Sequence, residues 1–128
     1  MKINSLNTKI KYFLIHLKIK KNTMKISKMQ ELLEAEVICC ENKLGNHVYS
    51  AFGCDLMSDV LAYVKDQAVL LTGLINSQVI RTAMMMDMVC VVFVRSKEPT
   101  EEMLQLARDN GIVVLSTNKR LYEACGLL

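Results

Sequence analysis

The sequence predicts an α/β fold in which a mainly parallel sheet of four to five strands lies between two layers of helices. Short apolar runs near residues 36–40, 69–71, 89–94 and 112–115 suit buried strands, and they alternate with segments of helical periodicity. Residues 68–95 follow the order strand, turn, helix, strand, which is a βαβ unit and is right-handed in nearly every known case. A chain of 128 residues can bury the core of one such domain.

The first elements of the domain are short. Ser27 and Gln30 have the spacing of a capping box, which predicts a helix over residues 28–33. A strand over residues 36–40 follows. Residues 48–54 fit either a strand or an extended connection, because Gly53 interrupts the run.

The next helix is expected to begin at a cap formed by Asp55 or Ser58 and to end near Lys65. Its apolar residues recur at helical spacing, which predicts one buried stripe. The stripe comprises Leu56, Val60, Leu61 and Val64.

The central βαβ unit has clear signals for where its strand ends and its helix begins and ends. Thr72 and Gly73 end its first strand, and Asn76 is a favourable N-cap for a helix over residues 77–86. Asp87 is expected to end that helix before the second strand begins.

The last third of the chain repeats this alternation. Thr100 is expected to cap a helix whose first turn carries two acids, where the helix dipole favours them, and Asn110-Gly111 is a typical C-terminal stop. After a strand over residues 112–115, Ser116 or Thr117 is expected to cap a last helix over residues 119–124.

The net charge of +3 is unevenly distributed. Residues 1–23 carry six of the 16 Lys and Arg and no acid, which leaves residues 24–128 with 10 basic and 13 acidic residues. A mildly acidic domain argues against nucleic acid as a partner. We expect residues 1–23 to be a disordered extension or translated upstream sequence, with a membrane- or partner-binding arm as the alternative; their apolar part is too short to span a membrane.

No set of residues points to catalysis or to a metal. The five Cys are odd in number and lack C-x-x-C spacing, so we expect reduced thiols, with Cys39 and Cys90 in the core of a cytoplasmic protein. Cys54 beside Asp55 is the one tempting nucleophile, and His47 is the only other partner in its vicinity. Neither nucleotide-binding glycine fingerprint is present, and we expect no enzyme and no cofactor.

The turns that follow three strands form a candidate ligand site. If the strands over residues 69–71, 89–94 and 112–115 are parallel, these turns meet at one edge of the sheet, where ligands of α/β folds bind. Each turn leads into a helix N-terminus, which favours an anion such as a phosphate. The candidate residues are Thr72, Gly73, Asn76, Arg81, Arg95, Ser96, Lys97, Ser116 and Thr117, with Lys119 and Arg120 nearby. The alternative is that the hydroxyls are helix caps and the cations surface charge.

Four methionines gather near one helix end, at Met84, Met85, Met86 and Met88. They cannot all face one core across a period of 3.6 residues, so some should be exposed or lie in a contact between subunits. A homodimer contact and simple packing against neighbouring loops are both compatible with this pattern.

Three stretches in order, LLTGLINSQVIRTA, VVFVRSKEPTEEMLQLA and GIVVLSTNKRLYEACG, resemble the DRTGG domain family from about Met24 onward. The resemblance implies an α/β domain similar to the N-terminal domain of HPr kinase. It also implies a regulatory or dimer-forming role, as where this domain accompanies CBS domains in pyrophosphatases. Pro99-Thr100 and Leu115-Ser116-Thr117 match the family, whereas Asn76-Ser77 and Arg95-Ser96-Lys97 replace its acidic-Arg and Thr-Gly-Gly motifs.

These observations predict a cytoplasmic, non-catalytic regulatory domain over residues 24–128. It would bind a phosphorylated or adenine-nucleotide-like small molecule, form a homodimer, or do both. A protein-interaction adaptor without a small-molecule ligand is the alternative, and we expect neither a nucleic acid nor a membrane as partner.

Overall fold

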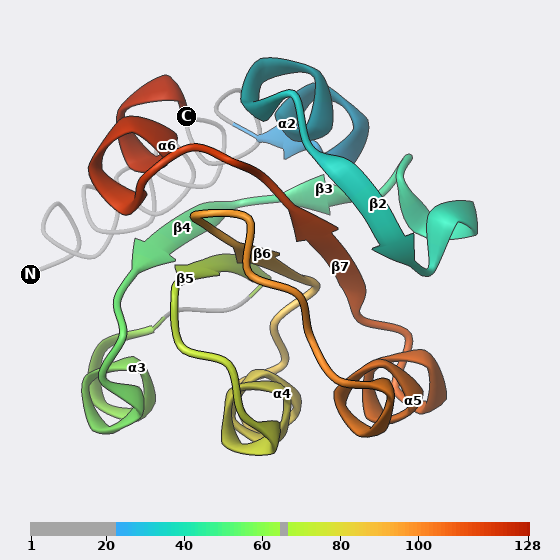
Figure 1. Ribbon diagram of the computed structural model, residues 1–128, viewed down its shortest axis with the longest axis vertical. Helices are drawn as coiled ribbons and strands as arrows, with labels where there is room; N and C mark the ends of the chain where they lie inside the picture. The colour runs from blue at the N-terminus through green and yellow to red at the C-terminus, as the bar shows by residue number, and fades with distance from the viewer. Residues whose placement is uncertain (1–22, 65–66) are drawn as a thin grey trace, which may run out of the picture.

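The computed structural model describes residues 23–64 and 67–128, which form a five-stranded sheet between two layers of helices (Figure 1). The strand order is β2-β7-β6-β5-β4, and β4 to β7 run parallel to one another. Only β2, at one edge, runs antiparallel, paired with β7. The predicted α/β class with a mainly parallel sheet is therefore confirmed. The extension expected over residues 1–23 lies outside the described residues, apart from Thr23.

The strands of the main sheet are β2 (Glu36–Cys39), β4 (Ser50–Gly53), β5 (Ala68–Thr72), β6 (Cys90–Phe93) and β7 (Val113–Ser116). The helices are α2 (Ile26–Leu33), α3 (Met57–Tyr63), α4 (Ser77–Met85), α5 (Glu101–Asp109) and α6 (Leu121–Leu127), with a 3-10 turn η1 at Glu41–Lys43. A second, two-stranded antiparallel sheet joins β1 (Met24–Lys25) to β3 (His47–Val48). The ambiguous segment 48–54 is thus divided between β3 and an edge strand of the main sheet.

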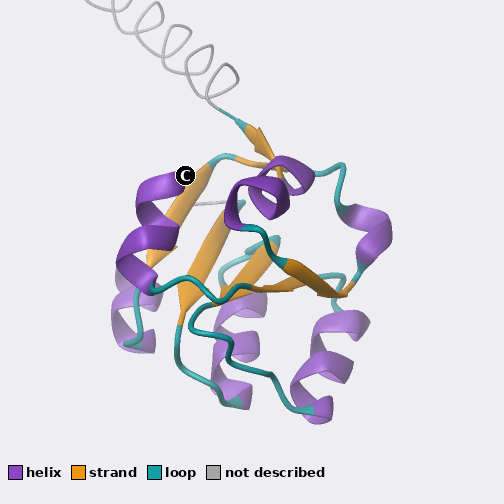
Figure 2. Cartoon of the chain, turned by 45° about the horizontal axis from the view of Figure 1, so that its top comes forward, coloured by secondary structure: helices purple, strands orange, loops and turns teal. Residues whose placement is uncertain are grey.

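The sheet separates two hydrophobic cores. Helices α3, α4 and α5 cover one face, and α2 and α6 cover the other, as both views show (Figures 1 and 2). The residues of each central strand alternate between the two cores: Val91 and Phe93 face α3 to α5, whereas Cys90 and Val92 face α2 and α6. Because both faces are covered, β5 and β6 are buried along their whole length, which explains their continuous apolar sequence. No helix in the described part of the chain could cross a membrane.

The signals at both ends of α5 were predicted correctly. Thr100 caps α5 as expected, since its Oγ1 accepts a hydrogen bond from the N–H of Met103 at 3.3 Å, and Gly111 follows the helix with φ of +67°. Asn76 stands at the N-cap of α4, but its side chain makes no capping bond.

The capping box at Ser27 is wrong, because α2 begins at Ile26 instead. The N–H groups of Ile26 and Ser27 donate to the carbonyls of Asn46 and Leu44, at 3.0 and 2.9 Å. Carbonyl groups of the segment just before β3 therefore accept from N–H groups at the start of α2, where the capping box predicts a side-chain acceptor. No side chain caps α3 or α6 either: their N-cap residues are Leu56 and Arg120, in place of the expected Asp55 or Ser58 and Ser116 or Thr117.

The buried stripe expected on α3 is only partly correct. Val60 is fully buried and Val64 is partly buried against the same core, but Leu56 and Leu61 are 57% and 39% exposed. Met57 takes the second buried position on this helix. The helix lies beneath the edge strand β4, so its outer side has no neighbouring element to pack against (Figure 1).

The four methionines at the end of α4 and just after it are divided between the core and the surface, as their spacing requires. Met88 is buried, Met84 and Met86 pack partly buried against the core, and Met85 alone is largely exposed. Most of this group therefore packs within the domain, which leaves one side chain rather than a Met-rich surface.

Two methionines allow a matched test of this packing. Met103 on α5 is fully buried and Met85 on α4 is 70% exposed. We expect Met103→Ala to lower the free energy of unfolding by about 2–5 kcal/mol, through lost burial and the cavity left behind. Met85→Ala should change it by less than about 0.5 kcal/mol. Urea unfolding measures both, and equal losses would contradict the assigned burial.

The buried thiols are those predicted. Cys39 and Cys90 are buried and unpaired with another sulfur. Burial, reinforced by the neighbouring Cys40, raises the pKa of Cys39 to about 11, and burial raises the pKa of Cys90 as well. Both thiols therefore stay protonated near neutral pH, which makes them poor nucleophiles.

Alkylation should distinguish the buried thiols from the exposed one. At pH 8 a thiol with a pKa of about 11 is ionised in roughly one molecule in a thousand. Iodoacetamide should therefore leave Cys39 and Cys90 unmodified in the folded protein. Cys125 is exposed and should react, although partial burial of its thiol raises its pKa as well and slows the reaction. Peptide mass mapping before and after addition of urea checks this; rapid modification of Cys90 without urea would show that the core opens readily.

Candidate functional site

The turns after the parallel strands gather at one edge of the sheet, as the sequence predicted. Thr72 pairs with Phe93, and Phe93 pairs with Ser116, so the three strand ends are level with one another. The N-terminal end of the antiparallel β2 joins this edge as well, because Glu36 pairs with Ser116. We call this the C-terminal edge; it comprises residues 34–36, 54–55, 72–77, 94–100 and 116–120.

A carboxylate organises the turn after β5. Oδ1 of Asp55 accepts hydrogen bonds from the hydroxyl of Thr72, at 3.0 Å, and from the N–H of Gly73, at 2.7 Å. The Thr72 hydroxyl in turn accepts from the N–H of Leu74 at 3.2 Å. The first N–H of this turn, that of Gly73, therefore already donates to a carboxylate of the protein, whereas the sequence predicts that it would bind an external anion.

The turn after β6 is held by the turn after β7. The N–H of Arg95 donates to the carbonyl of Lys119 at 2.8 Å, and the N–H of Ser96 donates to that of Thr117 at 2.9 Å. Arg95 and Ser96 adopt left-handed backbone angles, with φ of 59° and 55°. The Arg95 guanidinium lies against Gly73, where the Cβ of any other residue would collide with it. Gly73 has no positive φ, so its lack of a Cβ matters here only for the approach of the Arg95 guanidinium, which is the movable end of a flexible side chain.

The two hydroxyls after β7 bind backbone rather than cap a helix. Oγ of Ser116 donates to the carbonyl of Lys97 at 3.2 Å. Oγ1 of the buried Thr117 donates to the carbonyl of Leu33 at 2.7 Å and accepts from the N–H of Lys119. Thr117 therefore ties the end of α2 to this edge, so its hydroxyl is already committed within the protein.

The cations of the edge are mostly free. Within the described residues, the side chains of Arg95, Lys97 and Arg120 form no ion pair, and all three are exposed. Lys119 lies 3.9 Å from Glu34. Three exposed positive charges on neighbouring turns suit a phosphate group, which binds Lys and Arg readily.

Carboxylates that we did not predict line a cavity at the same edge. The cavity has a volume of about 520 Å³ and lies between the start of β2, the end of β7 and the turn before α5. Its lining includes Glu34, Glu36 and Glu98 together with three predicted residues, Ser96, Ser116 and Thr117. The edge is therefore mixed in charge, not basic as the sequence suggested. Only the antiparallel direction of β2 places Glu36 here, and the sequence held no signal for that direction.

Three of the predicted residues line this cavity: Ser96 after β6, and Ser116 and Thr117 at the end of β7. Arg95 and Lys97 flank Ser96 in the sequence but are not part of the lining, and neither are Thr72 and Gly73 of the β5 turn.

Asn76 and Arg81 are exposed on the α4 side, and within the described residues no hydrogen bond or ion pair joins them to the other candidates.

The described residues contain no cluster of three or more His, Cys, Asp or Glu arranged to hold a metal. The pair Cys54 and His47 does not form a nucleophile and base: the Cys54 sulfur contacts the backbone of Leu56, and Nδ1 of His47 lies 3.2 Å from Oγ1 of Thr23.

A doubly covered α/β sheet with a polar cavity at the C-terminal ends of its strands is an arrangement at which other α/β proteins bind ligands. A family model for the DRTGG domain matches residues 28–128, and the chain belongs to that family. No curated protein matched the chain.

Among solved structures the fold is similar to that of the CBS and DRTGG domains of the regulatory region of Clostridium perfringens pyrophosphatase. That structure contains the activator diadenosine tetraphosphate. The TM-score is 0.65 at 15% sequence identity, over 80% of this chain and 45% of that one. The chain thus spans less than half of that regulatory region, and the likeness shows the fold.

The role of Asp55 can be tested by substitution. Asp55→Ala leaves the buried N–H of Gly73 without its acceptor, so we expect a loss of about 1–3 kcal/mol in the free energy of unfolding. Asp59→Ala is the control: no hydrogen bond to the Asp59 carboxylate is found among the described residues, so its loss should cost less than about 1 kcal/mol. Equal effects in urea unfolding would contradict a structural role for the Asp55 carboxylate.

Proposed function

We propose that this chain is a non-catalytic regulatory domain that binds an adenine-nucleotide-like or otherwise phosphorylated ligand at the C-terminal edge and acts as a cytoplasmic homodimer. The observation that carries the ligand proposal is the cavity of about 520 Å³ lined by Ser96, whose chain neighbours Arg95 and Lys97 are exposed and form no ion pair within the described residues. Binding would bias a contact with a partner only by its different affinity for two states of the domain.

The mixed charge of the edge suits the two ends of a nucleotide. Phosphates require donors and positive charge, which Arg95, Lys97 and Arg120 offer on neighbouring turns. Ribose hydroxyls donate well to carboxylates, which Glu34, Glu36 and Glu98 present in the cavity. The pyrophosphatase regulatory region with a similar fold was solved with diadenosine tetraphosphate, a molecule that contains both phosphates and riboses. This supports the choice of ligand class.

A protein-interaction adaptor without a small ligand is the second candidate. One observation favours it: the N–H of Gly73 in the turn after β5 already donates to the Asp55 carboxylate, so this turn has one fewer free N–H group for a bound anion. The two functions differ in what raises the melting temperature.

Thermal unfolding with diadenosine tetraphosphate, ATP, AMP and inorganic phosphate distinguishes them. A ligand at about 100 times its Kd stabilises the folded state by about 2.7 kcal/mol, so at least one nucleotide should raise the Tm by several degrees. Arg95→Gln and Lys97→Gln should reduce that rise because they remove the phosphate partners. Lys25→Gln is the control, an exposed Lys on β1, and should retain the full rise.

Inorganic phosphate separates specific binding from general anion binding. A rise with nucleotides but not with phosphate at equal concentration supports the cavity as the nucleoside site. If none of the four compounds raises the Tm, the ligand proposal is wrong and the adaptor function gains.

A further inference from the structure

The two edges of the main sheet differ in how they are protected. An edge strand exposes unpaired backbone groups, and proteins usually protect it with charge, proline or a bulge. At one edge, β2 begins with the exposed Glu36, and its register shifts between Val37 and Cys39. At the other edge, β4 is the last strand in the order, and residues 49–54 contain no charged residue and no proline.

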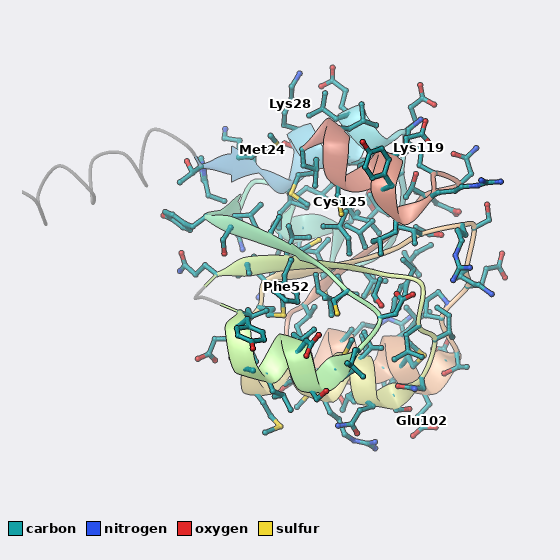
Figure 3. The ribbon with its side chains drawn as sticks, turned by 90° about the vertical axis from the view of Figure 1, so that its left-hand side faces the viewer. Met24, Lys28, Phe52, Glu102, Lys119 and Cys125 are labelled. Atoms are coloured by element: carbon teal, nitrogen blue, oxygen red, sulfur yellow. The ribbon has the colours of Figure 1, made fainter. Side chains whose placement is uncertain are left out.

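Apolar side chains lie exposed beside this unprotected strand. Below it, α3 and the turn before it expose Leu56 and Leu61, and the exposed fraction of Tyr63 reaches 69%. Leu127 on α6 and Tyr49 next to β4 are about two-fifths exposed. Figure 3 looks onto this side of the molecule: α3 runs below the strands, and Cys125 of α6 lies above them, opposite Phe52.

The strand also borders a cavity of about 320 Å³ on its α6 side. Its lining is mostly apolar and includes Met24, Val48, Tyr49, Ala51 and Leu128. Gly53 packs so closely on α6 that a Cβ there would collide with the Cys125 sulfur. The small side chains of Ala51 and Gly53 therefore leave the strand accessible along its length.

We propose that this surface, β4 with the exposed residues of α3 and α6, is the contact between two copies of this chain. The two β4 strands would pair antiparallel about a two-fold axis and join the two sheets into one of ten strands. The inference places the dimer named under the proposed function, and it does not depend on the ligand.

Charge favours a second copy as the occupant. A two-fold contact sets every patch against or near itself, so a charged patch would repel its own copy. Residues 49–54 are uncharged, and so are the side chains exposed on the second half of α3, at Leu61, Ala62 and Tyr63. The carboxylates of this side, Asp55, Asp59 and Glu123, lie outside these two stretches. Two uncharged β4 strands with open edges can therefore pair with each other without repulsion between like charges in the strands.

The expected contact differs from the Met-rich one considered from the sequence. Met85 and Tyr63 are equally exposed, at 70% and 69%, but lie on different helices, which makes them a matched pair. We expect the full chain without nucleotide to sediment as a dimer at micromolar concentration. Tyr63→Glu and Leu56→Glu should each weaken dimerisation at least tenfold, whereas Met85→Glu should leave it unchanged.

Because all three side chains are exposed, the variants should keep the far-UV circular dichroism spectrum of the parent, which shows that they fold; the Tm of Tyr63→Glu and Leu56→Glu should fall only by the stability that dimerisation contributes. Hydrogen exchange provides a second measurement: amides of residues 50–53 should become more protected as the protein concentration rises. A monomer at all concentrations, or a dimer that Met85→Glu dissociates and Tyr63→Glu does not, would overturn the proposal. A Tyr63→Glu monomer that still shows the nucleotide-induced rise in Tm would separate the dimer from the ligand site.

Discussion

The level register of β5, β6 and β7 is the constraint on which the rest of the molecule depends. Since Thr72, Phe93 and Ser116 pair across the sheet, the turns that follow these strands must begin side by side. Backbone hydrogen bonds then connect these turns to one another, as the bond from Arg95 to the Lys119 carbonyl illustrates. The cavity and its cations are consequences of that register, and no single turn could form them alone.

Much of this architecture could be predicted from local sequence, because buried parallel strands are continuous apolar runs and α5 carries its own cap at Thr100. Interactions between distant residues could not be predicted. Asp55 was assigned to a helix cap, but its carboxylate binds Thr72 and Gly73, 17 and 18 residues away. Ser27 and Thr117 failed as caps for the same physical reason: backbone or acceptors from other segments satisfy those groups.

The two surfaces proposed for binding are physically connected. Asp55 follows β4 by two residues, and its carboxylate holds Gly73, against which the Arg95 guanidinium lies. Pairing of β4 with a second copy would therefore act on a strand whose end positions a residue of the ligand edge. A ligand that binds the paired and unpaired states with different affinity would couple the two surfaces, and the coupling would be equal in both directions.

The turn at Arg95 and Ser96 has a consequence for how the domain could evolve. Each residue with a side chain in the left-handed region costs roughly 1–2 kcal/mol that glycine would not cost. Selection for thermal robustness alone would thus favour glycine at both positions. This chain instead carries a guanidinium and a hydroxyl there, and the bonds from the N–H groups of Arg95 and Ser96 to the carbonyls of Lys119 and Thr117 hold the backbone in that conformation.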